Sequence, residues 1–206
     1  LSFGGCPDCS ELVHCSIIEN IPIPQRIVPT TKDGLLDVRK FEEMLRLGKF
    51  NTFNNHCIFS ISLVNNETGV ITDPTFALKY LKEQFRFTLH IDAVAGFGKE
   101  NICWDPVKLG ADLMSISGHK IHALKGVGAL YVSERMAARC TKQLFNGGSH
   151  EFGMRAGTEN IIGIYTLGEM CDKIINDDFH KLQMNKIVEG RNLLESLLSD
   201  ISEING

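Results

Sequence analysis

Short apolar runs that each end in polar residues are the feature that most constrains the fold of this 206-residue chain. The run Cys57–Val64 has the length of one buried strand and breaks into the polar loop Asn65–Gly69. Shorter runs of the same kind follow at 89–91, 113–117 and 127–132. Helical periodicity falls between and after these runs, at 38–47, 73–85, 159–176 and 181–202. This order of elements predicts an α/β fold.

The composition excludes several classes of protein. Hydrophobic residues make up 43% and charged residues 22% of the chain, which is typical of a globular protein and not of a disordered one. No apolar stretch reaches the ~18 residues that a membrane helix needs, so we expect no membrane-spanning segment. The net charge of −4 gives no electrostatic basis for binding nucleic acid.

The seven cysteines are dispersed along the chain. Their odd number, together with a first segment that does not resemble a signal peptide, favours a reducing compartment. We therefore expect a cytoplasmic location, with a mitochondrial one as the alternative. Cys6 and Cys9 form a single CxxC motif, but a structural zinc site needs a second ligand pair at a matching distance. We interpret these two residues as free thiols near a frayed end.

Chemically competent side chains follow directly on the apolar runs, which is where ligands bind in open α/β sheets. Asp92 ends one run, and Ser117, His119 and Lys120 follow at the end of another. A lysine amine can form a Schiff base with pyridoxal phosphate (PLP), and an aspartate can keep the pyridine nitrogen of PLP protonated. Ser117 and His119 can donate hydrogen bonds to the phosphate, and Asn66 can reach the phenolic oxygen. Together these residues predict a PLP site.

Each of these residues also has an ordinary structural interpretation. A lone lysine in an apolar context usually extends to the surface, and Asn66 alone could close an Asx turn. We interpret Lys125 as a surface charge, and His90 and His122 as core or strand-end residues without a catalytic role. For Lys120, the arrangement of the whole set favours the cofactor interpretation.

The segment from Ser60 to Ile175 resembles the NifS/IscS-type cysteine desulfurases and selenocysteine lyases, in the class V group of fold-type I PLP enzymes. Three matching motifs are Asn-Asn-Glu-x-Gly, His-x-Asp-Ala, and Ser-x-His-Lys followed by Lys-Gly-x-Gly-Ala-Leu-Tyr-Val. Two more are Gly147–Glu151 and Arg155–Asn160. The order and spacing of five motifs over more than half of the chain make the resemblance highly specific.

The resemblance implies a fold and a set of site residues. It implies the PLP-binding large domain of fold-type I, a mainly parallel sheet flanked by helices, at 1–175. Residues 176–206 would be a helix that leads towards a small C-terminal domain not contained in the chain. Lys120 is implied to be the Schiff-base lysine and Asp92 the partner of the pyridine nitrogen.

The remaining implied contacts involve the other ends of the cofactor. Asn66 is implied to contact the ring, and Ser117 and His119 to bind the phosphate. Thr158 is implied to reach the phosphate of the neighbouring subunit across a homodimer.

The family reaction removes sulfur from L-cysteine. A cysteine thiolate of the enzyme attacks the substrate sulfur, which leaves an enzyme persulfide and releases L-alanine. In selenocysteine lyases, L-selenocysteine is the substrate. A sulfur-acceptor protein and the assembly of iron–sulfur clusters are implied as the wider context.

The sequence departs from the family pattern at several positions. Asn20 stands where a ring-stacking histidine is usual, Ala95 where a glutamine is usual and Phe152 where an arginine is common. Ala123-Leu124 replaces Gly-Pro, and the stretch 20–35 is short. No segment matches the phosphate loop, the persulfide cysteine or the arginine that binds the substrate carboxylate. We therefore expect a fragment or a reduced, divergent relative.

Two alternatives stay open at this point. The chain could be a truncated or degenerate homologue with weak or no PLP binding and no catalysis, as Asn20 and Ala95 indicate. It could also be another class V enzyme such as an aminotransferase, although the Arg155–Asn160 motif resembles the desulfurases.

Overall fold

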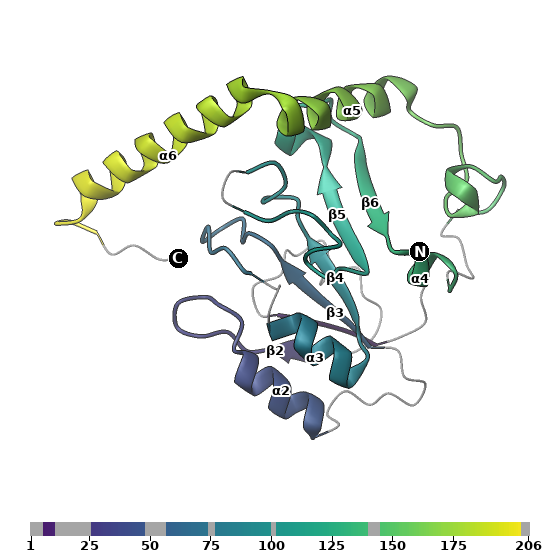
Figure 1. The fold of residues 1–206 in the computed structure, drawn as a ribbon, viewed down its shortest axis with the longest axis horizontal. Coiled ribbons are helices and arrows are strands. Elements are labelled where there is room, and N and C mark those ends of the chain that lie inside the picture. The colour runs from purple at the N-terminus through teal and green to yellow at the C-terminus, as the bar shows by residue number, and fades with distance from the viewer. Residues whose placement is uncertain are drawn as a thin grey trace.

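The computed structural model describes residues 6–10, 26–47, 57–73, 77–99, 102–139 and 145–202. Its centre is a six-stranded sheet with the order β2-β1-β3-β4-β5-β6 (Figure 1). The strands are β1 (Cys6–Ser10), β2 (Arg26–Val28), β3 (Cys57–Ser62), β4 (Thr88–Asp92), β5 (Leu113–Ser117) and β6 (Gly128–Val132). Neighbouring strands are parallel except for β5 and β6, which are antiparallel. The α/β fold with a mainly parallel sheet is confirmed.

The helices and short turns are α2 (Val38–Arg46), α3 (Ala77–Phe85), η1 (Gly118–Ile121), α4 (Glu134–Ala137), η2 (Glu151–Gly153), α5 (Ile161–Asn176) and α6 (Asp178–Leu198). Among them, α2, α3 and η1 lie between strands, and the others follow β6. Asp37 caps α2, since its Oδ1 accepts a hydrogen bond from the backbone N–H of Lys40 at 3.1 Å. Asn160 caps α5 in the same way through the N–H of Gly163.

The main hydrophobic core lies between the sheet and the pair α2–α3. Phe41 of α2 stacks on Phe59 of β3 with ring centroids 4.3 Å apart, and Phe87 meets both rings edge-on. All three rings are fully buried. This packing fixes β3 and β4 relative to each other, and both strands carry residues of the predicted site.

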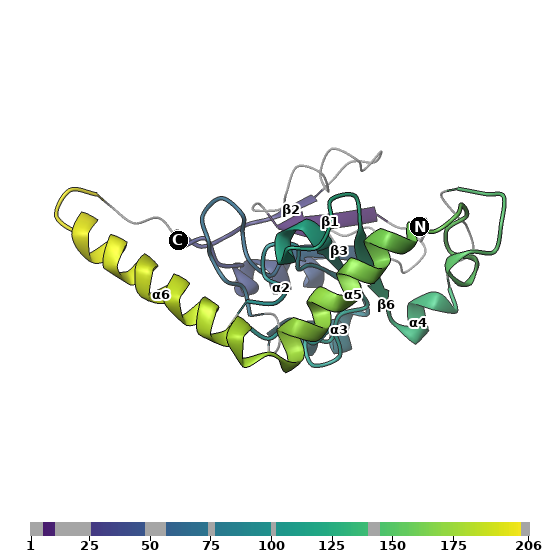
Figure 2. The same cartoon turned by 90° about the horizontal axis from the view of Figure 1, so that it is seen from above.

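A smaller core joins α5 to η1, the turn that contains Lys120. Ile121 of η1 packs against Leu167 and Ile174 of α5. Beyond it, α6 extends away from the sheet (Figures 1 and 2). Large apolar side chains of α6 are exposed, among them Leu182, Ile187, Leu193, Leu194 and Leu197. Among the described residues, none of the helices has the length and apolar character needed to cross a membrane.

The N-terminal segment differs from the prediction. Cys6 and Cys9 lie in β1, which pairs in parallel with β2 on one side and β3 on the other, so the frayed end predicted there is wrong. A strand is stabilised by its backbone hydrogen bonds to both neighbours, which the short and mixed sequence of this segment does not reveal. Within the stretch 20–35, the described residues include β2.

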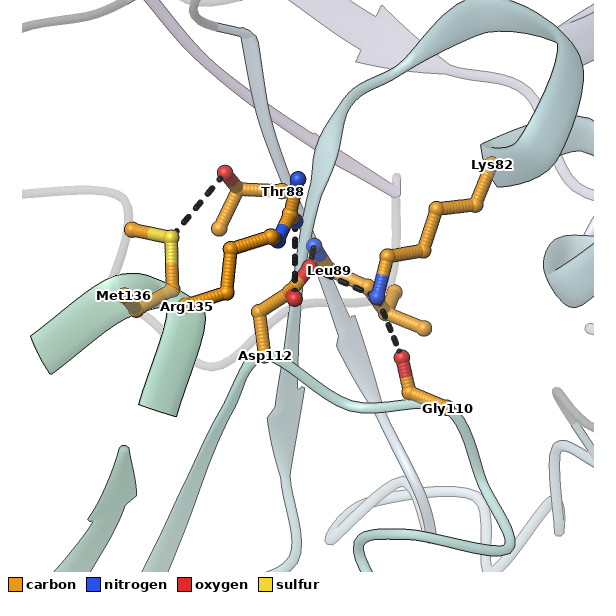
Figure 3. Close-up of polar contacts among 7 residues, drawn as sticks. All are labelled: Lys82, Thr88, Leu89, Gly110, Asp112, Arg135 and Met136. Carbon is orange, nitrogen blue, oxygen red and sulfur yellow. Dashed lines mark hydrogen bonds and ion pairs between the residues drawn. The ribbon is translucent and has the colours of Figure 1, made fainter. Parts of the chain in front are cut away.

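A buried carboxylate joins several elements at the amino-terminal ends of β4 and β5 (Figure 3). Asp112, just before β5, forms ion pairs with Lys82 of α3 and Arg135 of α4, each at 2.8 Å. Its Oδ2 also accepts the backbone N–H of Leu89 at 2.9 Å. The Lys82 amine donates in addition to the carbonyl of Gly110. Asp112 thus ties two helices to the amino-terminal ends of β4 and β5.

Candidate functional site

A cavity of about 130 Å³ opens at the carboxyl ends of β3 and β4. Its lining residues are Ser62, Val64, Asn66, Asp92, Val94, Ala95 and Lys120. Asn66, Asp92 and Lys120 thus converge from three separate segments of the chain, as the sequence predicts for strand ends of a parallel sheet. Ala95, the position at which a glutamine is usual, lines the same cavity.

Asp92 is fixed in the cavity wall by both neighbouring strands. Its carbonyl accepts the N–H of Leu63 at 2.8 Å, and the following N–H, of Ala93, donates to the carbonyl of Ser115 at 3.0 Å. Its Oδ1 accepts the N–H of Val94 at 3.0 Å. Within the described residues, Oδ2 of Asp92 has no hydrogen-bond partner. One carboxylate oxygen therefore orients the group, and the other is available to a ligand.

The two asparagines after β3 have different roles. Asn65 makes the Asx turn, because its Oδ1 accepts the backbone N–H groups of Glu67 and Thr68 at 2.9 and 2.8 Å. Gly69, with φ +76°, closes this turn in a conformation that favours glycine. Asn66 lies in the turn that Asn65 stabilises and lines the cavity. The Asx turn that was the structural alternative for Asn66 is thus made by its neighbour Asn65.

Lys120 lies in the one-turn helix η1, directly after β5. The N–H of Gly118 donates to the carbonyl of Val127, which anchors the start of this turn. Ser117 Oγ and His119 Nδ1 lie 2.8 Å apart, and neither residue is among those that line the cavity. In the described part of the chain the amine of Lys120 has no ion pair. A lysine without a carboxylate partner is free to bind a carbonyl ligand.

Two predicted positions lie away from the cavity. Thr158 is exposed in the loop before α5 and does not line the cavity of its own chain. Phe152 is 98% exposed. Asn20 lies outside the described residues. The interpretation of His122 as a core or strand-end residue is wrong, since it is exposed and ends η1 in a left-handed conformation.

His90 is hydrogen-bonded at both ring nitrogens. Its Nδ1 lies 2.7 Å from Ser60 Oγ, and its Nε2 lies 2.8 Å from Ser115 Oγ. Burial lowers the pKa of His90, and the negative charge of Asp92 partly opposes this shift. The strand position predicted for His90 is confirmed, but its two serine partners were missed.

Three lining residues were also missed, namely Ser62, Val64 and Val94. A signal for them exists in the sequence. Ser62 and Val64 precede Asn66 at steps of two residues, and Val94 follows Asp92 by two. Ser62 ends β3, and Val64 and Val94 each lie two residues beyond the end of a strand, next to the predicted site residues in the chain. The predicted site residues therefore indicate which nearby residues also line the cavity.

Residues 24–206 match the protein-family model described as Aminotransferase class-V. The chain therefore belongs to the class V aminotransferase family, which confirms the resemblance seen in its motifs.

Within that family the chain is similar to cysteine desulfurases. It is 33% identical over 193 residues to cysteine desulfurase IscS of Pseudoalteromonas translucida, which covers 92% of this chain and 44% of the relative. It is 36% identical over 173 residues to the IscS of Buchnera aphidicola, with 82% and 40% covered.

The chain is also similar to solved structures. A NifS-like protein from Rickettsia africae matches with a TM-score of 0.75 at 28% identity, over 94% of this chain and 52% of that chain. A structure described as SspA in complex with cysteine matches with a TM-score of 0.66 at 28% identity, over 82% of this chain and 47% of that one. The chain thus spans about half of the length of the proteins it matches, or less.

Proposed function

We propose that this chain carries the PLP-binding part of a cysteine desulfurase, which transfers the sulfur of L-cysteine to an enzyme cysteine and releases L-alanine. The observation that carries the proposal is the convergence of Lys120, Asp92 and Asn66 on one cavity. The IscS relatives support the substrate, because they are named cysteine desulfurases. L-selenocysteine is the alternative substrate. Turnover rates measured with L-cysteine and with L-selenocysteine distinguish the two.

The residues of the cavity fit PLP chemically. Counting only the residues that the structure describes, they offer an amine without an ion pair, a carboxylate with one free oxygen and an amide on the turn after β3. When bound, PLP supplies an electron-withdrawing ring that stabilises negative charge on the carbon atoms of an amino acid substrate. A ring of this kind needs an anion at its nitrogen and an amine at its aldehyde, which Asp92 and Lys120 provide.

Each side chain has a defined task in this proposal. With PLP bound, Asp92 would accept a hydrogen bond from the ring nitrogen and keep the proton on that nitrogen. Lys120 would hold the cofactor through its amine, and as a free amine it would accept and return protons at Nζ. Asn66 donates to the phenolic oxygen, while Val64 and Val94 form an apolar wall that limits access of water.

The phosphate end of the site involves the remaining predicted residues. Ser117 and His119, already paired with each other, are proposed to bind the phosphate. Thr158 is proposed to act in a homodimer, where it contacts the phosphate of the partner subunit. Its exposed position outside its own cavity is compatible with this role.

The wider context is proposed from the family. Residues 1–175 are the PLP-binding part, and 176–206 contain the helix that leads away from it. A sulfur-acceptor protein, use of the sulfur in iron–sulfur clusters and a reducing, cytoplasmic location complete the proposal.

The direct test is covalent trapping of PLP on the full 206-residue chain. The protein is incubated with PLP, reduced with borohydride, digested and mapped by mass spectrometry. We expect a pyridoxyl label on Lys120. No label on any lysine contradicts the proposed function and favours a non-catalytic relative. Release of alanine from L-cysteine, measured against amino transfer to a keto acid, then separates a desulfurase from an aminotransferase.

Ala95→Gln is expected to tighten PLP binding by about fivefold to tenfold, because one new hydrogen bond is worth about 1 kcal/mol. Ala95 lines the cavity and has no side-chain donor, whereas glutamine brings an amide within reach of the ring. The measurement is a PLP titration followed by absorbance. Ala138→Gln, at an exposed site after α4, is the control and is expected to change nothing. An unchanged dissociation constant for Ala95→Gln contradicts the placement of the ring next to this residue.

A further inference from the structure

Three adjacent strands each place two polar side chains on the same face of the sheet. They are Ser60 and Ser62 on β3, His90 and Asp92 on β4, and Ser115 and Ser117 on β5. Each pair is two residues apart, so both of its members point to one side. Asp92 and Ser62 of this set line the cavity, and His90 lies one step further from it along the strand.

The ring of His90 bridges the two outer strands of this group. Ser60 Oγ lies 2.7 Å from Nδ1, and Ser115 Oγ lies 2.8 Å from Nε2. A neutral imidazole has one donor and one acceptor nitrogen, and a serine hydroxyl can take either part. Both ring nitrogens are therefore satisfied without a charge. Ser60 is only 3% exposed, so its hydroxyl depends on a partner inside the protein.

The electrostatic setting of His90 favours the neutral ring. The neighbouring strands present serines to it, and within the described residues Asp92, on its own strand, is the charged group that acts on it. Burial lowers the pKa of His90 and outweighs the opposite effect of Asp92. A positively charged His90 ring would attract the Asp92 carboxylate and would therefore compete with a positively charged ligand atom for it.

This inference rests on the proposed function, because it assigns a role towards PLP. We propose that His90 is a positioning residue for the cofactor. Its ring, held between Ser60 and Ser115, fixes β4 to both neighbouring strands and thereby holds Asp92, at the end of β4, in place. A neutral ring at this position adds no positive charge that would offset the attraction between the Asp92 carboxylate and the ring nitrogen of PLP. A purely structural residue would only join the three strands and would not affect PLP binding.

The test compares three variants of the full chain in PLP titrations and in urea unfolding without PLP. His90→Phe keeps an aromatic ring but loses both hydrogen bonds, and we expect PLP binding to weaken about tenfold. His90→Gln keeps a neutral hydrogen-bonding group, and we expect it to recover binding to within about threefold of the original chain. Thr88→Val is the control, because Thr88 is buried on the same strand face and contacts Met136 rather than the cavity. It is expected to bind PLP normally.

The pH dependence gives a second readout that does not require the cofactor. The pKa of His90 is lowered in the folded protein, so the folded state binds this proton less readily than the unfolded chain does. The stability linked to His90 is therefore complete above the ordinary histidine pKa of about 6.5 and is lost as the pH falls through the folded value. Glutamine does not titrate, so we expect the free energy of unfolding of His90→Gln to fall less on acidification than that of the original chain.

The outcomes separate the inference from the proposed function. If the original chain takes up no PLP, the proposed function fails and the role of His90 fails with it. If PLP binds to the original chain and equally well to His90→Phe, only the role of His90 is overturned. If His90→Phe does not fold, Ser115→Ala replaces it. That variant removes one of the two hydrogen bonds and is expected to weaken PLP binding about threefold, and unchanged binding overturns the inference.

Discussion

Lys120→Ala is expected to abolish the covalent incorporation of PLP, whereas Lys125→Ala is expected to leave it unchanged. Lys120 lines the cavity together with Asp92 and Asn66, and its amine is the nucleophile that a carbonyl cofactor needs. Lys125 is exposed in the turn before β6 and does not line the cavity. Borohydride reduction followed by mass spectrometry of the peptides measures the label on each lysine. We expect a loss of at least about 100-fold for the first variant, since alanine has no nucleophile.

The control for Lys120→Ala is the stability of the variant. Lys120 is exposed, so its truncation is expected to change the free energy of unfolding by no more than about 0.5 kcal/mol. Loss of the label then reports on chemistry rather than on folding. A pyridoxyl group that persists at full yield on another lysine would show that Lys120 is not the attachment point, and Lys125 would be the next candidate.

Local patterns in the sequence predict most of the elements of this fold. The runs that became β3 to β6 and the periodic segments that became α2, α3, α5 and α6 carry their own signals, and Asp37 marks the start of α2. β1 carries no such signal. Its place between β2 and β3 depends on backbone pairing with segments distant in the chain. Strand order is a property of these pairings and not of local periodicity.

The same distinction explains which site residues could be predicted. Asp92 and Lys120 stand next to strand ends, so their position alone indicates a ligand site in an α/β sheet. The roles of Asn65 and Asn66 could not be separated, because both fit an Asx turn until the backbone is known. The partners of His90 lie 30 and 25 residues away in the sequence. They become visible only when the neighbours of β4 are known.

Asp112→Asn is expected to lower the free energy of unfolding by about 3 kcal/mol, because it removes one member of a buried ion-pair cluster. The Asp112 side chain is only 4% exposed and receives Lys82 on one oxygen and Arg135 on the other. Asparagine is nearly the same size but neutral, so both cations lose their counter-charge. Lys82 is 20% exposed and has little access to water in exchange. Urea unfolding followed by circular dichroism measures the change.

Asp105→Asn is the matched control for this cluster. Asp105 pairs with Lys108 at 3.7 Å, and both side chains are well exposed, so we expect a change of at most about 0.5 kcal/mol. A loss of less than about 1 kcal/mol for Asp112→Asn would contradict the structural role given to the cluster. Because Asp112 lies at the amino-terminal ends of β4 and β5, and the cavity at the carboxyl end of β4, the folded fraction of this variant is expected to keep its PLP label on Lys120. The stability of the sheet and the chemistry of the site can therefore be changed separately, since they depend on opposite ends of the same strands.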